Sequence, residues 1–242
     1  MSWNEFVDKF NLCFVDNGYS KWLLEGFWKS IVITLFAIII GFFIGMVVAA
    51  IRSSYEKNKE HLKKSKTAGS VILTILNAVC KLYVTVIRGV PVVVQLMIWY
   101  FVILVSQNND LLVAIIAFGF NSGAYVAEIF RGGIMSIDKG QFEAGRSLGF
   151  SYIKTMIYII IPQMFKVVLP TLLNEAIALL KETSVAGYVG IMDLTKAGDL
   201  IRGRTFEAFL PLFAVALIYL ATVIILSSVF SSLERRLRKS EH

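Results

Sequence analysis

The chain has 242 residues, of which 57% are hydrophobic and 17% are charged, and its formal net charge is +7. Soluble domains are about 45–50% apolar and roughly 25% charged, so this composition excludes an ordinary soluble domain. The basic excess does not indicate nucleic-acid binding, because no basic patch is interleaved with aromatic residues. Cys13 and Cys80 show no metal-ligand spacing, and we expect no metal site.

Residues 1–26 form a segment of their own ahead of the first long apolar stretch. Its apolar residues recur at the spacing of one helix face: Trp3, Phe6, Val7, Phe10 and Phe14. This pattern predicts a short amphipathic helix. The helix either lies on the membrane surface or packs against a neighbouring subunit, and the sequence leaves both alternatives open.

Residues 27–233 contain apolar stretches long enough to cross a bilayer, which takes about 20 residues as a helix. Five spans are predicted: Phe27–Ile51, Ala68–Val105, Leu111–Ile134, Tyr152–Leu180 and Phe206–Leu233. A basic tail, residues 234–242, follows the fifth span. The sequence therefore predicts an all-α membrane protein.

The second stretch, Ala68–Val105, is longer than one straight span. As a single helix it would measure roughly 57 Å, against a hydrocarbon core of about 30 Å. Arg88, Gly89 and Pro91 interrupt it. Two antiparallel spans would leave the second one short, whereas one bent span would place the interruption at a bend or gate.

Charge distribution decides between these alternatives. With one bent span, the polar segments Arg52–Thr67 and Ser136–Ser151 face the same side. Basic loops prefer the cytoplasm, so we predict one bent span, an outer N-terminus and a cytoplasmic tail. Lys181–Arg204 then falls outside, where its glycines suggest a folded re-entrant or gate segment.

The loop between spans three and four, residues 136–151, contains a second amphipathic helix candidate. It runs from Gln141 to Leu148 and ends at Gly149, a residue that readily forms a left-handed cap. Glu143 lies early and Arg146 late, as the helix dipole favours. Such a helix, joined to two spans, can act as a lever for whatever docks on it.

This loop resembles the Glu-Ala-Ala loop of permease subunits of ATP-binding-cassette (ABC) importers. The family pattern is Glu-Ala-Ala, three residues, Gly, then nine residues to Ile-x-Leu-Pro. The chain has Glu143-Ala144-Gly145, then Gly149, then Ile159-Ile160-Ile161-Pro162. Gly145 replaces Ala and Ile161 replaces Leu, and the spacing is unchanged.

Three further segments resemble signatures of the polar amino acid uptake branch of that family. They are Arg88-Gly89-Val90-Pro91 with Gln95, the run Ser122-Gly123-Ala124-Tyr125-Val126-Ala127-Glu128-Ile129-Phe130-Arg131-Gly132-Gly133-Ile134, and Leu179-Leu180-Lys181-Glu182-Thr183-Ser184. Together with the loop they extend over most of residues 27–233.

The resemblance implies a type I ABC importer permease core in a bacterial cell membrane. It implies pairing with an identical or homologous permease, two ABC ATPase subunits docked on the loop helices, and an external or periplasmic amino-acid-binding protein. The chain has no phosphate loop of its own, so we expect it to be no enzyme and to bind no cofactor, with ATP-Mg held by the partner ATPase. The ATPase-coupling residues would be Gln141, Glu143, Ala144, Gly145, Ser147, Leu148 and Gly149.

Polar groups inside a membrane are costly unless paired or wetted, so the acids of span four are candidate substrate ligands. Glu175 and Glu182 are seven residues apart and share a helix face. They could bind an ammonium or guanidinium group, or one could pair with Lys181 while the other lines a wet vestibule. The resemblance favours substrate contact and, slightly, a basic amino acid.

Ser122, Tyr125 and Gln95 complete the substrate-site candidates, although a buried Tyr often simply finds a core partner. Glu128 and Arg131, three apart, are expected to neutralise each other. The main alternative function is an ion-coupled secondary amino acid transporter, which would explain the acids but usually shows internal repeats. A non-transporting membrane subunit would leave the charged spans unexplained.

Overall fold

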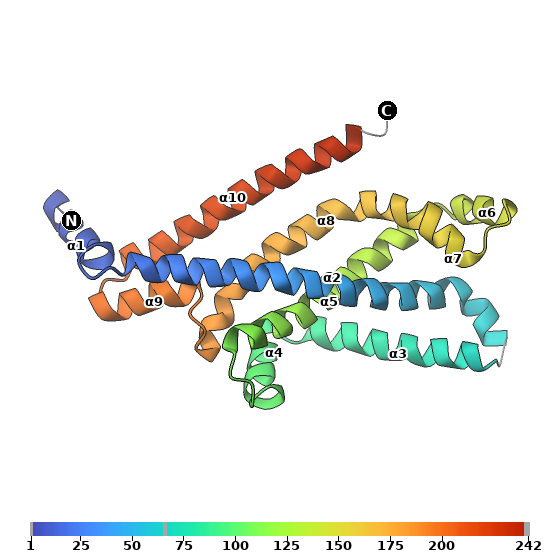
Figure 1. Ribbon diagram of the computed structural model, residues 1–242, viewed down its shortest axis with the longest axis horizontal. Helices are drawn as coiled ribbons and strands as arrows, with labels where there is room; N and C mark the ends of the chain where they lie inside the picture. The colour runs from blue at the N-terminus through green and yellow to red at the C-terminus, as the bar shows by residue number, and fades with distance from the viewer. Residues whose placement is uncertain (1, 65–66, 240–242) are drawn as a thin grey trace. The chain divides into compact units, whose positions relative to one another are not determined.

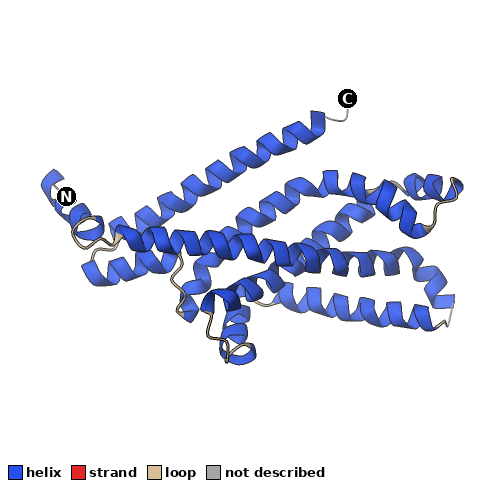
Figure 2. Ribbon diagram, viewed as in Figure 1, coloured by secondary structure: helices blue, strands red, loops and turns tan. Residues whose placement is uncertain are grey.

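A computed structural model describes residues 2–64 and 67–239, and within them it contains helices and connecting loops with no strand (Figure 2). The elements labelled in Figure 1 follow in chain order. They are α1 (Trp3–Phe14), α2 (Ser20–Lys64), α3 (Ala68–Gly89), α4 (Val92–Ile98), the π-helix η1 (Trp99–Ile103), α5 (Asp110–Ser136), α6 (Lys139–Ser147), α7 (Tyr152–Thr155), the π-helix η2 (Met156–Ile160), α8 (Ile161–Glu182), the 3-10 helix η3 (Thr183–Val189), α9 (Leu194–Thr205) and α10 (Phe209–Lys239).

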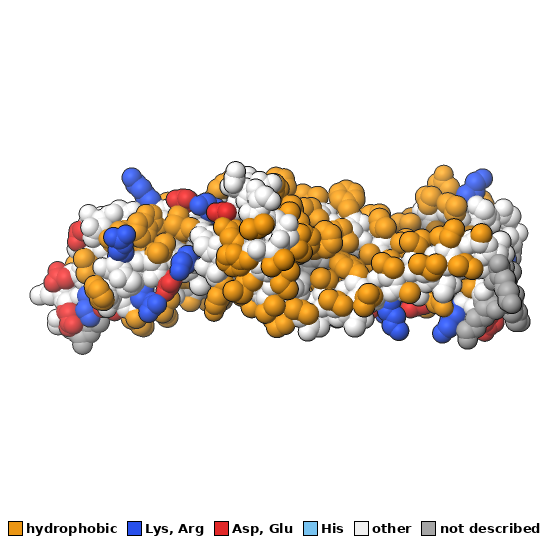
Figure 3. Space-filling view, turned by 90° about the horizontal axis from the view of Figure 1, so that it is seen from below, with side chains coloured by type: hydrophobic (Ala, Val, Ile, Leu, Met, Phe, Trp, Pro, Cys, Tyr) orange, Lys and Arg blue, Asp and Glu red, His pale blue; other side chains and the backbone are white. Residues whose placement is uncertain are grey.

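The described chain has five helical segments that are long and apolar enough to cross a membrane, which confirms the predicted number. Their apolar side chains are widely exposed, Leu82 by 64% and Ile225 by 62%, and orange hydrophobic side chains predominate on the face seen in Figure 3. Burial differs among them. In the most apolar window of α5, 61% of the residues are buried, against 28% or less in the others. α5 is therefore the span with the largest buried share among the described residues.

Several helix boundaries differ from the prediction. α2 begins at Ser20 rather than Phe27 and continues to Lys64, so Arg52–Lys64 is helix rather than loop. The polar residues after Arg52 do not end the helix, because Lys and Glu are good helix formers. The fifth span starts at Phe209 rather than Phe206, and α10 runs on through the expected tail to Lys239. Residues 240–242 of that tail lie outside the described residues.

The second apolar stretch is not one bent helix. α3 ends at Gly89, Val90 and Pro91 are extended, and α4 starts a separate helix at Val92. A residue before proline is pushed out of the helical region, and this ends α3. The predicted break at Gly89–Pro91 is therefore present, and the stretch contributes one long span rather than two, as predicted, but that span ends at Gly89 and not at Val105. α3 alone is the second span.

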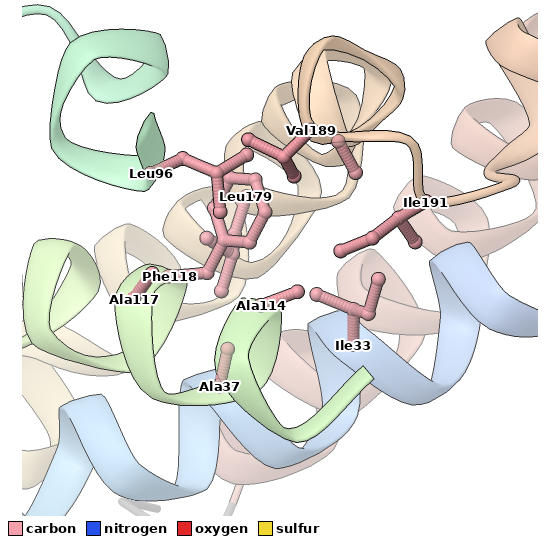
Figure 4. Close-up of a cluster of buried hydrophobic side chains, with 10 residues drawn as sticks. Ile33, Ala37, Leu96, Ala114, Ala117, Phe118, Leu179, Val189 and Ile191 are labelled. Atoms are coloured by element: carbon pink, nitrogen blue, oxygen red, sulfur yellow. The ribbon is translucent and has the colours of Figure 1, made fainter. Parts of the chain in front are cut away.

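The described chain divides into two compact units, and each is treated by itself. The first contains residues 2–38, 91–118 and 176–231, and the second contains residues 39–64, 67–90, 119–175 and 232–239. The first unit has a core of fully or nearly fully buried side chains, shown in Figure 4, among which Phe118, Leu96 and Leu179 are the largest. This core joins α4, the start of α5 and the end of α8.

The segment Lys181–Arg204 is folded within the first unit. η3 and α9 bury Ala186, Leu194 and Ile201 completely, so a free loop is excluded. Asp193 is the N-cap of α9, and its buried carboxylate accepts hydrogen bonds from the backbone N–H groups of Thr195 and Lys196 at 2.9 and 3.1 Å. Burial raises the pKa of Asp193, and these hydrogen bonds oppose the rise.

α1 packs on α9 in the first unit. Cys13 is fully buried there, and the Lys9 ammonium lies 3.0 Å from the Glu207 carboxylate. Trp3 and Phe10 remain exposed on the same helix. The N-terminal helix expected from the aromatic periodicity is therefore present, and one of its faces contacts the protein itself.

Candidate functional site

The second unit brings α2, α3, α5 and α8 together around Ser122. Gly41 and Gly45 lie on α2 with the small-xxx-small spacing that lets membrane helices approach closely. A Cβ atom at Gly41 would lie 2.9 Å from the Ser122 Cβ, and one at Gly45 would lie 2.8 Å from the Val126 Cβ. These two glycines therefore place the backbone of α2 directly against α5.

α3 is fixed to the same turn of α5 by a tyrosine. The Tyr83 hydroxyl donates a hydrogen bond to the Phe120 carbonyl oxygen at 2.6 Å. Its oxygen also lies 2.8 Å from where a Cβ of Gly123 would be, so any larger residue there would displace it. This packing leaves the Ser122 side chain fully buried.

The Ser122 hydroxyl donates a hydrogen bond to the Glu175 carboxylate of α8, with 3.2 Å between the oxygens. Glu175 itself is only partly buried. One turn along α5, the Tyr125 ring lies under the Arg88 guanidinium, 5.2 Å from the ring centroid, a cation–π arrangement. The structure thus groups four predicted residues, Ser122, Glu175, Tyr125 and Arg88, in one unit.

The other two substrate-site candidates belong to the first unit. Gln95 is buried on α4, and Glu182 is the last residue of α8 and partly buried. Both acids of span four therefore lie on one continuous helix, as their spacing predicted. Of the predicted bend residues, Gly89 ends α3 and Pro91 precedes α4, each exposed to solvent or lipid.

Further along α2 and α5, four charged side chains form a chain of ion pairs. Glu128 pairs with Arg131 at 2.9 Å and with Arg52, and Arg131 reaches Glu56 at 3.4 Å. The Glu128–Arg131 pair was expected. The two α2 partners were not, because Arg52–Thr67 was interpreted as a loop.

The predicted loop helix is present as α6. It begins two residues before Gln141, where the Asp138 side chain accepts a hydrogen bond from the backbone N–H of Gly140 at 2.6 Å. Gly149 ends it with φ +79°, in the left-handed region that favours glycine. Most of the ATPase-coupling candidates face solvent: Gln141, Glu143, Ala144, Ser147, Leu148 and Gly149.

Gly145 differs from the other coupling candidates because it is buried against α7. A Cβ at this position would lie 2.7 Å from Thr155 Cγ2 and 2.8 Å from Thr155 Oγ1. A second tie joins the Gln141 and Gln163 side chains, with 3.2 Å between the amide nitrogen of Gln163 and the amide oxygen of Gln141. α6 is therefore held tightly against α7 and the start of α8.

A widened helical turn lies between α7 and α8. The π-helix η2 ends one residue before Ile161, and Pro162 follows. Proline lacks the N–H that would continue the helical ladder, and single π-turns often occur at functional positions. Among the described residues no group of three His, Cys, Asp or Glu side chains could hold a metal ion.

A multi-pass helical membrane protein with a capped, exposed loop helix is the class that this fold and site define. Residues 65–239 match the family model described as binding-protein-dependent transport system inner membrane component. The chain belongs to this family, the permease subunits of ABC importers.

The chain is similar to the glutamine transport system permease protein GlnP of Escherichia coli K12, with 39% identity over 68% of this chain and 77% of that protein. It is 37% identical to the arginine transport system permease protein ArtQ of Bacillus subtilis, over 71% and 85%. A crystal structure of an amino acid ABC transporter with histidines is 34% identical and covers 90% of this chain and 95% of that one, with a TM-score of 0.76. The methionine transporter MetNI shares the fold, with a TM-score of 0.73 at 18% identity.

Proposed function

We propose that this chain is the permease subunit of an ATP-driven amino acid importer, in which α6 transmits movement of a partner ATPase to the membrane helices. The family supports the importer assignment, and the relatives named above carry glutamine or arginine transport in their names. They give no support to the ion-coupled alternative. The observation that carries the coupling role is the tight seat of Gly145 on Thr155.

Coupling through α6 requires that the helix be rigidly attached to its neighbours. An exposed helix on a flexible loop would absorb a displacement, whereas one in close contact passes it on. α6 is capped at both ends, and its Gln141 side chain is tied to Gln163 on α8. A push on the exposed side of α6, where Glu143 lies, therefore moves α7 and the start of α8 with it.

Glu175 and Ser122 are the substrate contacts that the geometry favours. The hydrogen bond from Ser122 orients the Glu175 carboxylate, and Tyr125 presents a ring one turn further along α5. A carboxylate at this position attracts the α-ammonium group of any amino acid and the side-chain cation of a basic one. It slightly favours a basic substrate. Glu182 and Gln95 remain proposed substrate contacts on the basis of the sequence.

The partners follow from the proposed role. Two copies of an ABC ATPase bind ATP-Mg and dock on α6 of this chain and of a second permease, identical or homologous. An amino-acid-binding protein delivers substrate from outside. The permease itself hydrolyses nothing.

Uptake by the complete complex in sealed vesicles tests this proposal. Labelled arginine and glutamine should enter only with the ATPase, enclosed ATP and the binding protein present, and ionophores that collapse ion gradients should leave the rate unchanged. Uptake that continues without ATP and stops with an ionophore would establish the ion-coupled alternative.

A further inference from the structure

A cavity of about 440 Å³ opens in the second unit between the end of α2, the end of α5, α6 and α7. Its walls carry the basic side chains of Lys57, Lys139 and Arg146 and the aromatic rings of Phe142 and Tyr152. One coupling candidate, Glu143, lines this cavity as well, whereas its three basic residues are not among the proposed coupling residues.

The positive charges in the cavity lack acidic partners. Among the described residues, none forms an ion pair with Lys57, Lys139 or Arg146. The Lys57 ammonium lies over the Phe142 ring, and the nearby charge of Lys139 repels it. Glu56, also at the cavity, is directed to Arg131 at 3.4 Å.

A partly buried ammonium beside a like charge is unfavourable unless an anion restores the balance. Two carboxylates share the wall: Glu56 is directed to Arg131, and Glu143 makes no ion pair with the three cations. Three cations from α2 and α6 around one space suit a group with several acceptor oxygens. Phosphate is such a group, and lysine is a common ligand for it.

The position of the cavity favours a lipid as the source of the phosphate. α2 passes from its apolar span directly into the stretch that carries Lys57, and basic residues just beyond a span attract acidic headgroups. Two nearby apolar side chains are exposed: Met135 lines the cavity and is 46% exposed, and Ile153, next to the lining residue Tyr152 in the chain, is 68% exposed. They provide a path along which an acyl chain can leave the cavity.

We propose that this cavity binds the phosphate headgroup of an acidic phospholipid through Lys57, Lys139 and Arg146. The site goes beyond the proposed function. Only its consequence rests on that function: because α6 forms one wall, a bound headgroup would hold α6 toward α2 and tune coupling.

Native mass spectrometry of the purified, delipidated transporter complex tests the proposal without ATP turnover. The probes are phosphatidylglycerol, phosphatidylcholine with the same acyl chains, and inorganic phosphate. We expect the complex to retain phosphatidylglycerol over phosphatidylcholine, and Lys57→Gln/Lys139→Gln to lose that retention severalfold. Lys59→Gln, an exposed lysine of α2 outside the cavity wall, is the matched control and should retain the lipid.

Equal retention of the two lipids, or a double variant that retains phosphatidylglycerol like the unaltered complex, would overturn the proposal. Phosphate that binds through the same lysines and is not displaced by phosphatidylglycerol would assign the site to a soluble anion and overturn the lipid assignment. If the double variant fails to fold, Lys139→Gln alone serves, because this exposed side chain of α6 makes no ion pair. Failure of the coupling proposal would leave all these results unchanged.

Discussion

The Ser122 hydroxyl donates a hydrogen bond to the Glu175 carboxylate, joining α5 to α8 at a point where the two residues are 53 positions apart in the sequence. Two glycines of α2 press on the same part of α5, and Tyr83 of α3 bonds to the turn just before it. A carboxylate held in this way by a buried hydroxyl is oriented before any substrate arrives.

Glu175→Gln should reduce transport while leaving the helices in place, because the amide oxygen can still accept the hydrogen bond from Ser122. A hydrogen bond to a charged group contributes about 1.5–3 kcal/mol, so we expect uptake at low substrate concentration to fall by about ten- to a hundredfold. Initial rates of ATP-driven uptake measure this. Glu60→Gln, an exposed acid of α2, is the control. An unaltered uptake rate in Glu175→Gln would show that the Glu175 carboxylate does not bind the substrate.

Gly145→Ala should destabilise the contact between α6 and α7. The new methyl group would crowd Thr155, and overpacking costs about 1–3 kcal/mol. Gly132→Ala on α5 is the matched control, since no heavy atom outside its own helix lies within 4 Å of the added Cβ. We expect it to be neutral or stabilising by about 0.5–1 kcal/mol. Thermal unfolding of the reconstituted complex compares the two variants.

A double variant sharpens this prediction. Gly145→Ala/Thr155→Ala should be less destabilised than the sum of the two single variants, because removing the Thr155 methyl and hydroxyl makes room for the new Cβ. Additive losses of unfolding free energy would mean that residues 145 and 155 do not contact each other. Such a result would contradict the tight attachment of α6 to α7.

Glu128→Gln should destabilise the second unit by about 2 kcal/mol, somewhat below the 3–5 kcal/mol of a fully buried pair. The change leaves Arg52 and Arg131, whose side chains are 14% and 26% exposed, beside each other without the central carboxylate. Glu25→Gln removes the partner of Lys29 from an exposed pair, and such pairs contribute about 0–1 kcal/mol. Equal unfolding temperatures for the two variants would show that the ion-pair chain does not hold α2 to α5.

The buried Asp193 predicts a pH dependence. Its pKa in the folded state is raised by burial, so the folded protein binds this proton more tightly than the unfolded chain does. The stabilisation is fully present below the unfolded pKa and is lost as the pH rises through the folded one. Asp193→Asn retains the N-cap of α9 and should lack this dependence.

The stability difference between the unaltered protein and Asp193→Asn, followed by thermal unfolding from acid to neutral pH, measures it. Asp193→Ala, which loses the cap, should lose about 1 kcal/mol at every pH. If the unaltered protein and Asp193→Asn show parallel curves, the burial of this carboxyl does not affect folding.

The sequence predicted the five spans because hydropathy and bilayer thickness set their number and approximate place. It placed α6 within two residues, because Gly149 marks its end. Helix ends in polar stretches were missed: α2 continues past Arg52 since its polar residues are themselves good helix formers.

Contacts between elements that are distant along the chain could not be predicted from the sequence. Glu175 and Ser122 were each selected, but nothing in a single chain says that they touch. The Gly41-x-x-x-Gly45 spacing is a sequence signal of a close helix–helix contact. It would still not have named α5 as the partner. Likewise, the Ala-to-Gly change at position 145 was noted, while its reason, the proximity of Thr155, became visible only in the fold.

We propose α6 as the point where ATP hydrolysis is coupled to transport, and Glu143→Lys tests this most directly. Glu143 is exposed on α6 and makes no ion pair among the described residues, so its reversal should leave the membrane fold intact. ATP hydrolysis and amino acid uptake are measured together in vesicles, with Glu60→Lys as the control for the added charge. We predict that the complex carrying Glu143→Lys either loses the ATPase or hydrolyses ATP with little uptake. Unaltered ATP-driven uptake in this variant would contradict the coupling role of α6.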